Sequence, residues 1–153
     1  MYPSLHDRLK TQHEALERII ALADISRLEL HPFEGKWSIR DNIAHLARYQ
    51  LIFIERIKRI LTTDHPHIDR YNAENDPDFE NWRRLGIPEL SAHLKKEREV
   101  IFNLISTLSD HQLGRQGRHT KYGNLTIVQW TEFFLLHEAH HLFTIFQLAN
   151  DTE

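Results

Sequence analysis

The chain has 153 residues, which is enough for one domain with a sizeable hydrophobic core. Its net charge is −3 with the histidines counted as neutral, and no basic run stands out, so a nucleic-acid partner is not expected. The sequence contains no cysteine, which excludes disulfides, thiolate metal sites and cysteine nucleophiles and leaves nitrogen and oxygen atoms as metal ligands. The first residues lack an apolar signal-peptide segment, and no stretch reaches membrane-spanning length. We therefore expect a cytoplasmic protein without membrane contact.

The first two of four predicted helices both begin at a serine. Ser4 is followed three residues later by Asp7, and Ser38 by Asp41, a spacing typical of the capping box that opens a helix. Apolar residues then recur every three or four positions, as one buried face of a helix requires. The two apolar stripes cover residues 5–23 and 39–61.

The third and fourth helices are predicted at residues 88–108 and 126–150. Pro88 is of a type favoured in the first helical turn, and Thr126 with Gln129 forms another capping box. No run of residues alternates as a strand would. Four helices of about 20–25 residues, each with one apolar stripe, indicate an all-α fold, a four-helix bundle.

The connections between these helices differ in length. Residues 25–37 join the first pair, and residues 109–125, which contain three glycines, are expected to form a loop. At ~3.3 Å per extended residue, residues 63–87 can cross the whole bundle, which makes the second and third helices parallel. A short helix is expected within this crossover at residues 79–85. We take residues 1–153 as a single domain.

Two histidines on the fourth helix are candidates for a metal site. His137 and His141 are four residues apart, which separates them by about 40° of rotation and 6 Å of rise, so both lie on one helical face. That face is the apolar one, whereas His140 faces solvent. Burying two neutral imidazoles side by side is costly without a shared partner, which a metal ion would provide. The alternative is that they are ordinary core histidines held by hydrogen bonds.

A third candidate ligand, His45, lies on the flank of the second helix beside Asn42 and Tyr49. It can join the pair only if the second and fourth helices are neighbours. Otherwise it is a boundary histidine with one edge in water.

The residues 137–141 also match the HExxH motif of zinc peptidases, in which two histidines bind zinc and the glutamate is the general base. Thr144 and Gln147 occupy the positions of the glycine and histidine in the longer version of that motif, and only 12 residues follow His141. A peptidase is therefore disfavoured. Glu138 is expected to orient a ligand histidine, to act on a metal-bound water, or to form a salt bridge with an arginine.

Several other polar residues need an interpretation. Gln12, Gln50 and Glu97 interrupt the apolar stripes near the middle of three helices, so they form a polar layer at the height of His137 if the helices are level. The alternative is that one or two of them reach solvent at the edge of a stripe.

Three loop histidines complete the set. His65 and His67 could bind metal as a pair, but a solvated loop is the favoured interpretation. His119 is expected to line the mouth of a site if its loop folds over the bundle.

Three segments resemble the DinB/YfiT-like family of metal-dependent enzymes: WSIRDNIAHL at residues 37–46, YGNLTI at 122–127 and HEAHHL at 137–142. In layout the resemblance covers nearly the whole chain. It implies a bundle of up-down-down-up order in which His45, His137 and His141 bind a divalent metal ion. Members are typically homodimers that bind zinc or nickel. Some transfer low-molecular-weight thiols such as bacillithiol onto small electrophiles, and others are called hydrolases.

Together these features predict a metal-dependent thiol transferase or hydrolase that acts on a small molecule bound among Trp130, Tyr49 and Phe53. Zn²⁺ or Ni²⁺ is the expected cofactor, with a low-molecular-weight thiol as a possible co-substrate, and no catalytic residue is assigned. The alternative is a non-catalytic bundle that binds metal for structure or as a sensor. Leu136 and Phe143 on the otherwise polar side of the fourth helix predict a homodimer interface.

Overall fold

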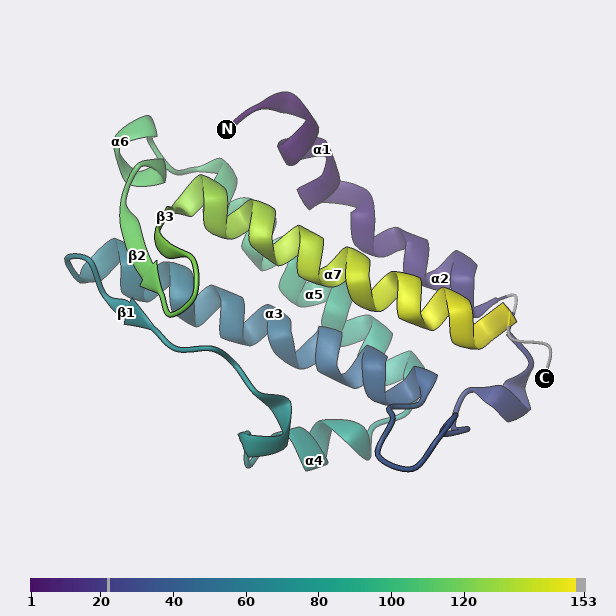
Figure 1. Cartoon of the computed structure of the whole chain (residues 1–153). Helices are drawn as coiled ribbons and strands as arrows, with labels where there is room; N and C mark the ends of the chain where they lie inside the picture. The colour runs from purple at the N-terminus through teal and green to yellow at the C-terminus, as the bar shows by residue number, and fades with distance from the viewer. Residues whose placement is uncertain (22, 151–153) are drawn as a thin grey trace.

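A computed structural model describes residues 1–21 and 23–150 of the chain (Figure 1). Within these residues four helical rods form the frame. The first rod is interrupted and consists of α1 (Pro3–Thr11), the 3₁₀ helix η1 (Gln12–Glu14) and α2 (Ala15–Ile20). The other three rods are α3 (Ile39–Thr62), α5 (Ile87–Ser106) and α7 (Ile127–Asn150).

The rods follow the predicted up-down-down-up order. In Figure 1, α1 and α2 run in one direction, α3 and α5 run in the opposite direction, and α7 returns in the first. α3 packs against both α5 and α7, while α1 also contacts α5 and α7. The four-helix bundle and the parallel pair on either side of the crossover are therefore confirmed. Because α3 and α7 are neighbours, the condition for His45 to approach the other histidines is met.

Short elements fill the connections. The first connection contains the 3₁₀ helix η2 (Ile25–Arg27). The crossover contains β1 (His67–Ile68), the 3₁₀ helix η3 (Ala73–Asn75) and α4 (Phe79–Arg83), and the last connection contains α6 (Asp110–Leu113), β2 (Gln116–His119) and β3 (Gly123–Thr126). The predicted short helix in the crossover is thus confirmed, although it ends before residue 85. None of the described helices is long and apolar enough to cross a membrane.

The expectation that the chain has no strand, and that residues 109–125 are a plain loop, is wrong. β2 and β3 form an antiparallel hairpin, and β1 pairs in parallel with β2 through His67 opposite Arg118. Two of the glycines that suggested a loop serve this sheet. Gly123 has a φ of 73°, which suits the end of a tight turn. A Cβ on Gly117 would lie 2.7 Å from Ile60 Cγ1, so this glycine allows the strand to lie directly on α3.

The helix starts agree with the sequence at two of three capping boxes. Ser38 and Asp41 exchange both hydrogen bonds, at 3.1 and 3.0 Å, and Thr126 and Gln129 do so at 2.9 and 3.2 Å. The box predicted at Ser4 is wrong, because α1 begins at Pro3, two residues earlier than a cap at Ser4 requires, and has no side-chain cap. A proline needs no partner for a backbone N–H in the first turn, so it opens the helix by itself.

The core consists of two apolar clusters with a polar layer between them. One cluster lies toward the sheet and includes Ile60 and Trp130, and the other lies toward α4 and includes Leu94 and Ile145. At the level where they meet, α3, α5 and α7 each contribute a buried polar side chain. These side chains are Gln50, Arg98 and Glu138.

Candidate metal centre

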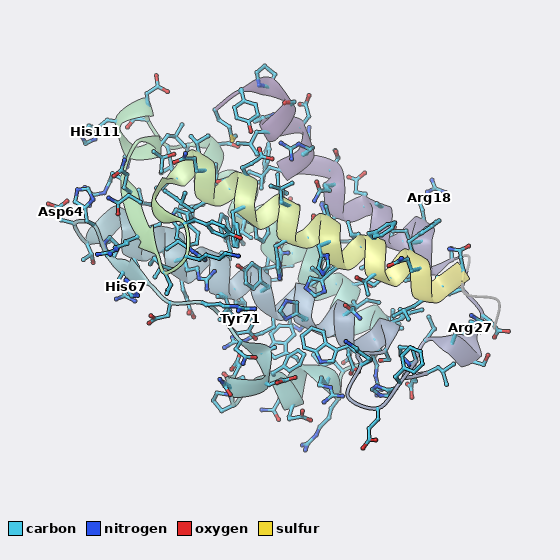
Figure 2. All side chains as sticks on the ribbon, in the orientation of Figure 1. Arg18, Arg27, Asp64, His67, Tyr71 and His111 are labelled. Carbon is cyan, nitrogen blue, oxygen red and sulfur yellow. The ribbon has the colours of Figure 1, made fainter. Side chains whose placement is uncertain are left out.

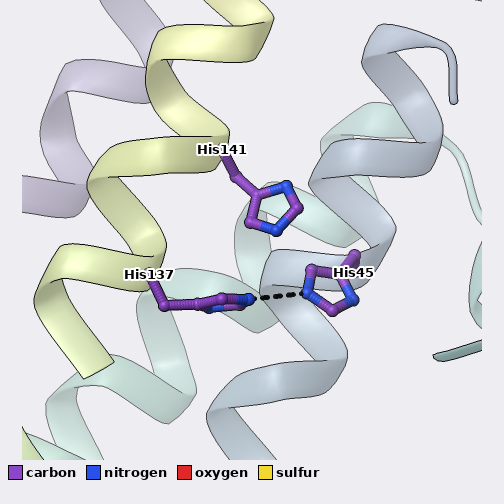
Figure 3. A group of neighbouring side chains, drawn as sticks. All are labelled: His45, His137 and His141. Atoms are coloured by element: carbon purple, nitrogen blue, oxygen red, sulfur yellow. Dashed lines mark hydrogen bonds between the residues drawn. The ribbon is translucent and has the colours of Figure 1, made fainter. Parts of the chain in front are cut away.

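His45 on α3 and His137 and His141 on successive turns of α7 point toward one another, as Figure 3 shows. One ring nitrogen of each lies within 4.8 Å of the others, and the Nε2 atoms of His45 and His137 are 3.0 Å apart. His45 is buried and the other two are half-buried. The structure thus brings together all three predicted ligands in what we call the three-histidine cluster, and it leaves His140 exposed as predicted.

The arrangement of the three rings fits a cation bound by nitrogen atoms. The 3.0 Å distance between Nε2 of His45 and Nε2 of His137 also fits a direct hydrogen bond between these two rings. Asn42 Oδ1 lies 2.8 Å from His141 Nδ1, and because that oxygen can only accept, His141 carries its proton on Nδ1 and keeps the Nε2 lone pair free. A hydrogen bond between His45 and His137 leaves this third lone pair without a role. A shared divalent ion uses all three nitrogens, and a set of imidazoles without carboxylates suits Zn²⁺ and its neighbours among the transition metals.

The electrostatics keep the three-histidine cluster neutral at physiological pH. Burial is the main cause in each case. It lowers the pKa of His45 to about 2, with further contributions from His141 and His137. It lowers the pKa of His137 to about 3, helped by His141, His140 and Arg56, and that of His141 to about 4, helped by His140. The ring lone pairs are therefore not lost to protons near neutral pH.

Aromatic side chains surround the three-histidine cluster. Trp37, which precedes α3, lies 6.0 Å from the ring of His141 in a stacked arrangement. The ring of Tyr71 stacks on that of His45, with 5.7 Å between ring centres, and Figure 2 shows Tyr71 on the crossover segment beside α3. Tyr49 lies 4.1 Å from His137 between ring centres. These rings fix the orientation of the imidazoles and reduce the access of water.

A cavity of about 470 Å³ opens beside His137. Tyr49 lines it, as expected for the substrate site, but Trp130 and Phe53 do not, because both are fully buried in the core. That part of the predicted substrate site is wrong. His119 on β2 does line the cavity, as expected for a segment that folds over the bundle.

Glu138 faces away from the cavity and forms a buried ion pair with Arg98 of α5. Gln12 donates a hydrogen bond to Glu138 at 3.0 Å, and Arg98 donates one to Gln50 at 3.2 Å. Of the three roles considered for Glu138, the salt bridge is the one observed. The predicted polar layer therefore exists with Gln12 and Gln50, but Glu97 takes no part in it and Arg98 stands in its place.

The paired histidines of the crossover are not part of the three-histidine cluster. His65 and His67 are exposed, and His67 lies 3.2 Å from its neighbour Asp69. In Figure 2 His67 points outward at the periphery of the molecule. Both histidines are therefore solvated as expected, but His67 lies in β1 and not in a loop.

These features define a helical bundle with an all-imidazole candidate metal site. The sequence profile of the DinB superfamily matches residues 8–145, and the chain belongs to this family.

Two related sequences and two solved structures are similar to this chain. A protein of Oceanobacillus iheyensis named "Putative metal-dependent hydrolase OB0413" is 29% identical over 112 residues, which cover 71% of this chain and 62% of the relative's own length, less than two thirds of it. The uncharacterized protein YuaE of Bacillus subtilis is 27% identical over 147 residues, or 88% of each chain.

Among solved structures, YfiT of Bacillus subtilis is described as a probable metal-dependent hydrolase with an unusual four-helix bundle topology. It matches with a TM-score of 0.78 and 23% identity, over 95% of this chain and 83% of its own. A DinB-like protein of the same organism matches with a TM-score of 0.62 and 15% identity, over 99% of this chain and 94% of its own. These likenesses support the fold, including its bundle topology.

Proposed function

We propose that this protein is an enzyme that holds a divalent metal ion with His45, His137 and His141 and uses it to hydrolyse a small molecule. The observation that carries the proposal is the convergence of the three ring nitrogens within 4.8 Å beside a cavity. A metal ion bound there would act as a Lewis acid toward water or a thiol. The names of the relatives, which refer to metal-dependent hydrolases, support the same reaction class.

The residues around the three-histidine cluster have separate tasks in this proposal. Asn42 orients the ring of His141 through the bond to its Nδ1. Trp37 covers the cluster beside His141 and does not line the cavity. Tyr71 stacks on His45 and lines the cavity together with His137, so a substrate approaches past His137. A structural metal site would need no such opening, and this favours the enzyme over a purely structural or sensory role.

Elemental analysis of untagged protein tests the metal assignment. We propose Zn²⁺ or Ni²⁺, because three imidazoles without a carboxylate favour these ions over Mg²⁺ or Ca²⁺. The wild type and the control variant His140→Ala should carry about one ion per chain, since His140 is exposed beside the site. His45→Ala and His137→Ala should lose it. An equal metal content in all four proteins would show that the ligand assignment is wrong.

The reaction class is tested on the metal-loaded protein. Small activated esters and amides are supplied with and without a low-molecular-weight thiol, and His45→Ala serves as the metal-free control. Turnover without thiol supports hydrolysis. Turnover only with thiol would support the second candidate, thiol transfer. A divalent ion held by three neutral ligands would also suit this reaction, because its positive charge would favour an anionic thiolate as the fourth ligand. No turnover with either would leave a non-catalytic metal-binding protein.

We also propose that the protein forms a homodimer through α7. Leu136 and Phe143 on this helix are 57% and 59% exposed, and Phe146 is 45% exposed. Exposed apolar residues gathered on one helix are typical of an interface. Light scattering at micromolar concentration should give a dimeric mass. Leu136→Glu with Phe143→Glu should give a monomer, whereas Val100→Glu, which changes an exposed apolar residue of α5, should not. A monomeric wild type would contradict this proposal.

A further inference from the structure

The cavity beside His137 carries an excess of positive charge. Arg56 of α3, Arg70 of the crossover and Lys121 of the hairpin turn all line it, and no acidic residue does. Among the described residues none of these three cations forms an ion pair within 4.0 Å. Other arginines of the molecule, such as Arg48 and Arg83, do pair with acids. Exposed cations elsewhere, such as Arg18 and Arg118, also lack an ion pair among the described residues. What distinguishes the cavity is that three cations and no acid line it.

Arg56 is the residue whose charge most needs a partner. Only 8% of it is exposed. Its Nη1 donates to Tyr49 Oη and its Nη2 to the backbone oxygen of Asp69, both at 2.8 Å, and its guanidinium lies 5.6 Å from the centre of the Trp130 ring. These contacts hold the side chain firmly but are all to neutral groups. A buried charge without a counter-ion is costly to maintain, which is typical of a site that receives an anion.

Two further donors line the same cavity. Because Arg56 donates to Tyr49 Oη, the hydroxyl proton of Tyr49 is free to bond elsewhere. His119 Nδ1 accepts hydrogen bonds from the backbone N–H groups of Lys121 and Tyr122, at 3.0 and 3.2 Å. This fixes the proton of the neutral ring on Nε2, which thereby becomes a donor. Donors without acceptors, beside cations without acids, match the oxygen atoms of a carboxylate or phosphate.

We propose that this cavity recognises the anionic group, a carboxylate or a phosphate, of a small aromatic or planar substrate. Arg56, Arg70 and Lys121 bind the anionic oxygens, and the rings of Tyr49, Tyr71 and Tyr122 contact the flat part. The volume of about 470 Å³ suits a ligand of this size. The inference rests on the proposed function, because His137 lines the same cavity and so places the reacting end of the substrate beside the three-histidine cluster.

Binding of simple probes to the metal-free protein tests this inference without any assay of activity. Protein dialysed against a chelator is titrated with benzoate, with phenyl phosphate and with benzamide, and heat is measured by calorimetry. Benzamide has the shape of benzoate without its charge. The acids should bind at least about tenfold more tightly than benzamide, because the charge-assisted bonds are lost with the neutral probe. Comparison of the two acids identifies the preferred anion. Equal binding of benzoate and benzamide, or no binding of either acid, would overturn the inference.

Matched variants locate the effect. Arg70→Gln and Lys121→Gln change exposed side chains that form no hydrogen bond or ion pair among the described residues, so folding should be unaffected. Each should weaken benzoate binding by about fivefold, in line with one partly solvated cation. Arg118→Gln, on β2 but outside the cavity, should leave it unchanged. An equal loss in Arg118→Gln would show that only the general charge of the surface matters, which also overturns the inference.

The two proposals fail in different ways. Metal content is measured by elemental analysis, and anion binding is measured on protein without metal. Anion binding together with an absence of metal at the three-histidine cluster would contradict the proposed function alone. A bound metal together with no anion binding would contradict the present inference alone.

Discussion

Asn42 Oδ1 accepts a hydrogen bond from Nδ1 of His141 at 2.8 Å, so a side chain of α3 sets the ring orientation of a residue on α7. The same asparagine is tied to its own helix, because its Nδ2 donates to the backbone oxygen of Ser38 at 2.8 Å. These two hydrogen bonds of Asn42, to Ser38 and to His141, therefore fix the orientation of one candidate metal ligand before a metal ion binds. Such outer contacts fix the tautomer and the ring orientation of metal-bound histidines.

Replacement of this contact should weaken metal binding. In Asn42→Leu the acceptor is lost with little change in volume, so the affinity for Zn²⁺ should fall by about 10- to 100-fold. Asn42→Asp keeps an acceptor at the same position and should retain the wild-type affinity. A competition titration with a chromophoric chelator measures both, and urea unfolding shows whether either variant is folded. Wild-type affinity in a folded Asn42→Leu would mean that His141 needs no positioning.

The buried pair of Arg98 and Glu138 should support stability rather than metal binding. Both side chains are 1% exposed, and Gln50 and Gln12 satisfy further donors and acceptors around them. Removing one charge leaves the other buried, so Glu138→Gln and Arg98→Met should each lower the free energy of unfolding by about 3–5 kcal/mol. The double variant Arg98→Met/Glu138→Gln should lose less than the sum of the two single losses.

Urea denaturation of the single and double variants measures these losses, and the metal affinity of Glu138→Gln is measured beside them. That affinity should be unchanged, because Glu138 does not contact the three-histidine cluster. A folded Glu138→Gln of normal stability that had lost metal binding would instead assign the glutamate to the site.

The sequence predicted features whose signals are local. Each of these features involves neighbouring residues of a single helix. Examples are the capping boxes at Ser38 and Thr126 and the spacing of His137 and His141. The length of the crossover then determined that the helices beside it are parallel. His45 could be included as the third candidate ligand because its inclusion depended on a single packing contact, that of α3 with α7.

The missed features depend on contacts between distant residues. β1 is two residues long and pairs with Arg118 and His119, which follow it by about fifty positions, so no alternation of residues could reveal it. The cavity cations come from three separate elements and share no sequence spacing. Arg98 was missed because arginine is rarely buried. Two signals were available. Glu138 is an acid within an apolar arc, which requires a partner of opposite charge, and Arg98 stands four residues after Leu94 and three before Ile101 on the apolar face of its helix.

Gly117 should be intolerant of any side chain. A Cβ there would lie 2.7 and 2.8 Å from Cγ1 and Cδ1 of Ile60, closer than atoms pack. Gly117→Ala should therefore lower the free energy of unfolding by about 1–3 kcal/mol. Gly114→Ala is the control, because its new Cβ would meet atoms at 3.5 Å, an ordinary contact distance.

Ile60 supplies the complementary test of this contact. Ile60→Ala removes the clashing atoms, so Gly117→Ala should cost less in that background than in the wild type. Thermal and urea unfolding of the four combinations measure the coupling. Additive losses would mean that the strand simply moves away from α3.

His13 should make stability depend on pH. Burial, followed by the charges of Arg98 and Lys95, lowers its pKa from 6.5 to about 4, while Glu17 opposes the shift. Its Nδ1 is buried without a partner among the described residues. Between these two pKa values the unfolded chain binds the proton and the folded chain does not. The contribution of His13 therefore destabilises the fold progressively as the pH falls from 6.5 toward 4, and it changes no further below that.

The variant His13→Gln should lack this pH-dependent contribution to stability. Comparison with the wild type therefore separates the contribution of His13 from those of the other buried histidines. Its loss of unfolding free energy between pH 7 and pH 4.5 should be smaller than that of the wild type by about 1–2 kcal/mol, which allows for the partial contact of His13 with solvent. His111→Gln, a change at an exposed histidine, should follow the wild type. Urea unfolding at a series of pH values gives the three curves. If the His13→Gln curve runs parallel to that of the wild type, His13 is protonated in the folded protein as readily as in the unfolded chain.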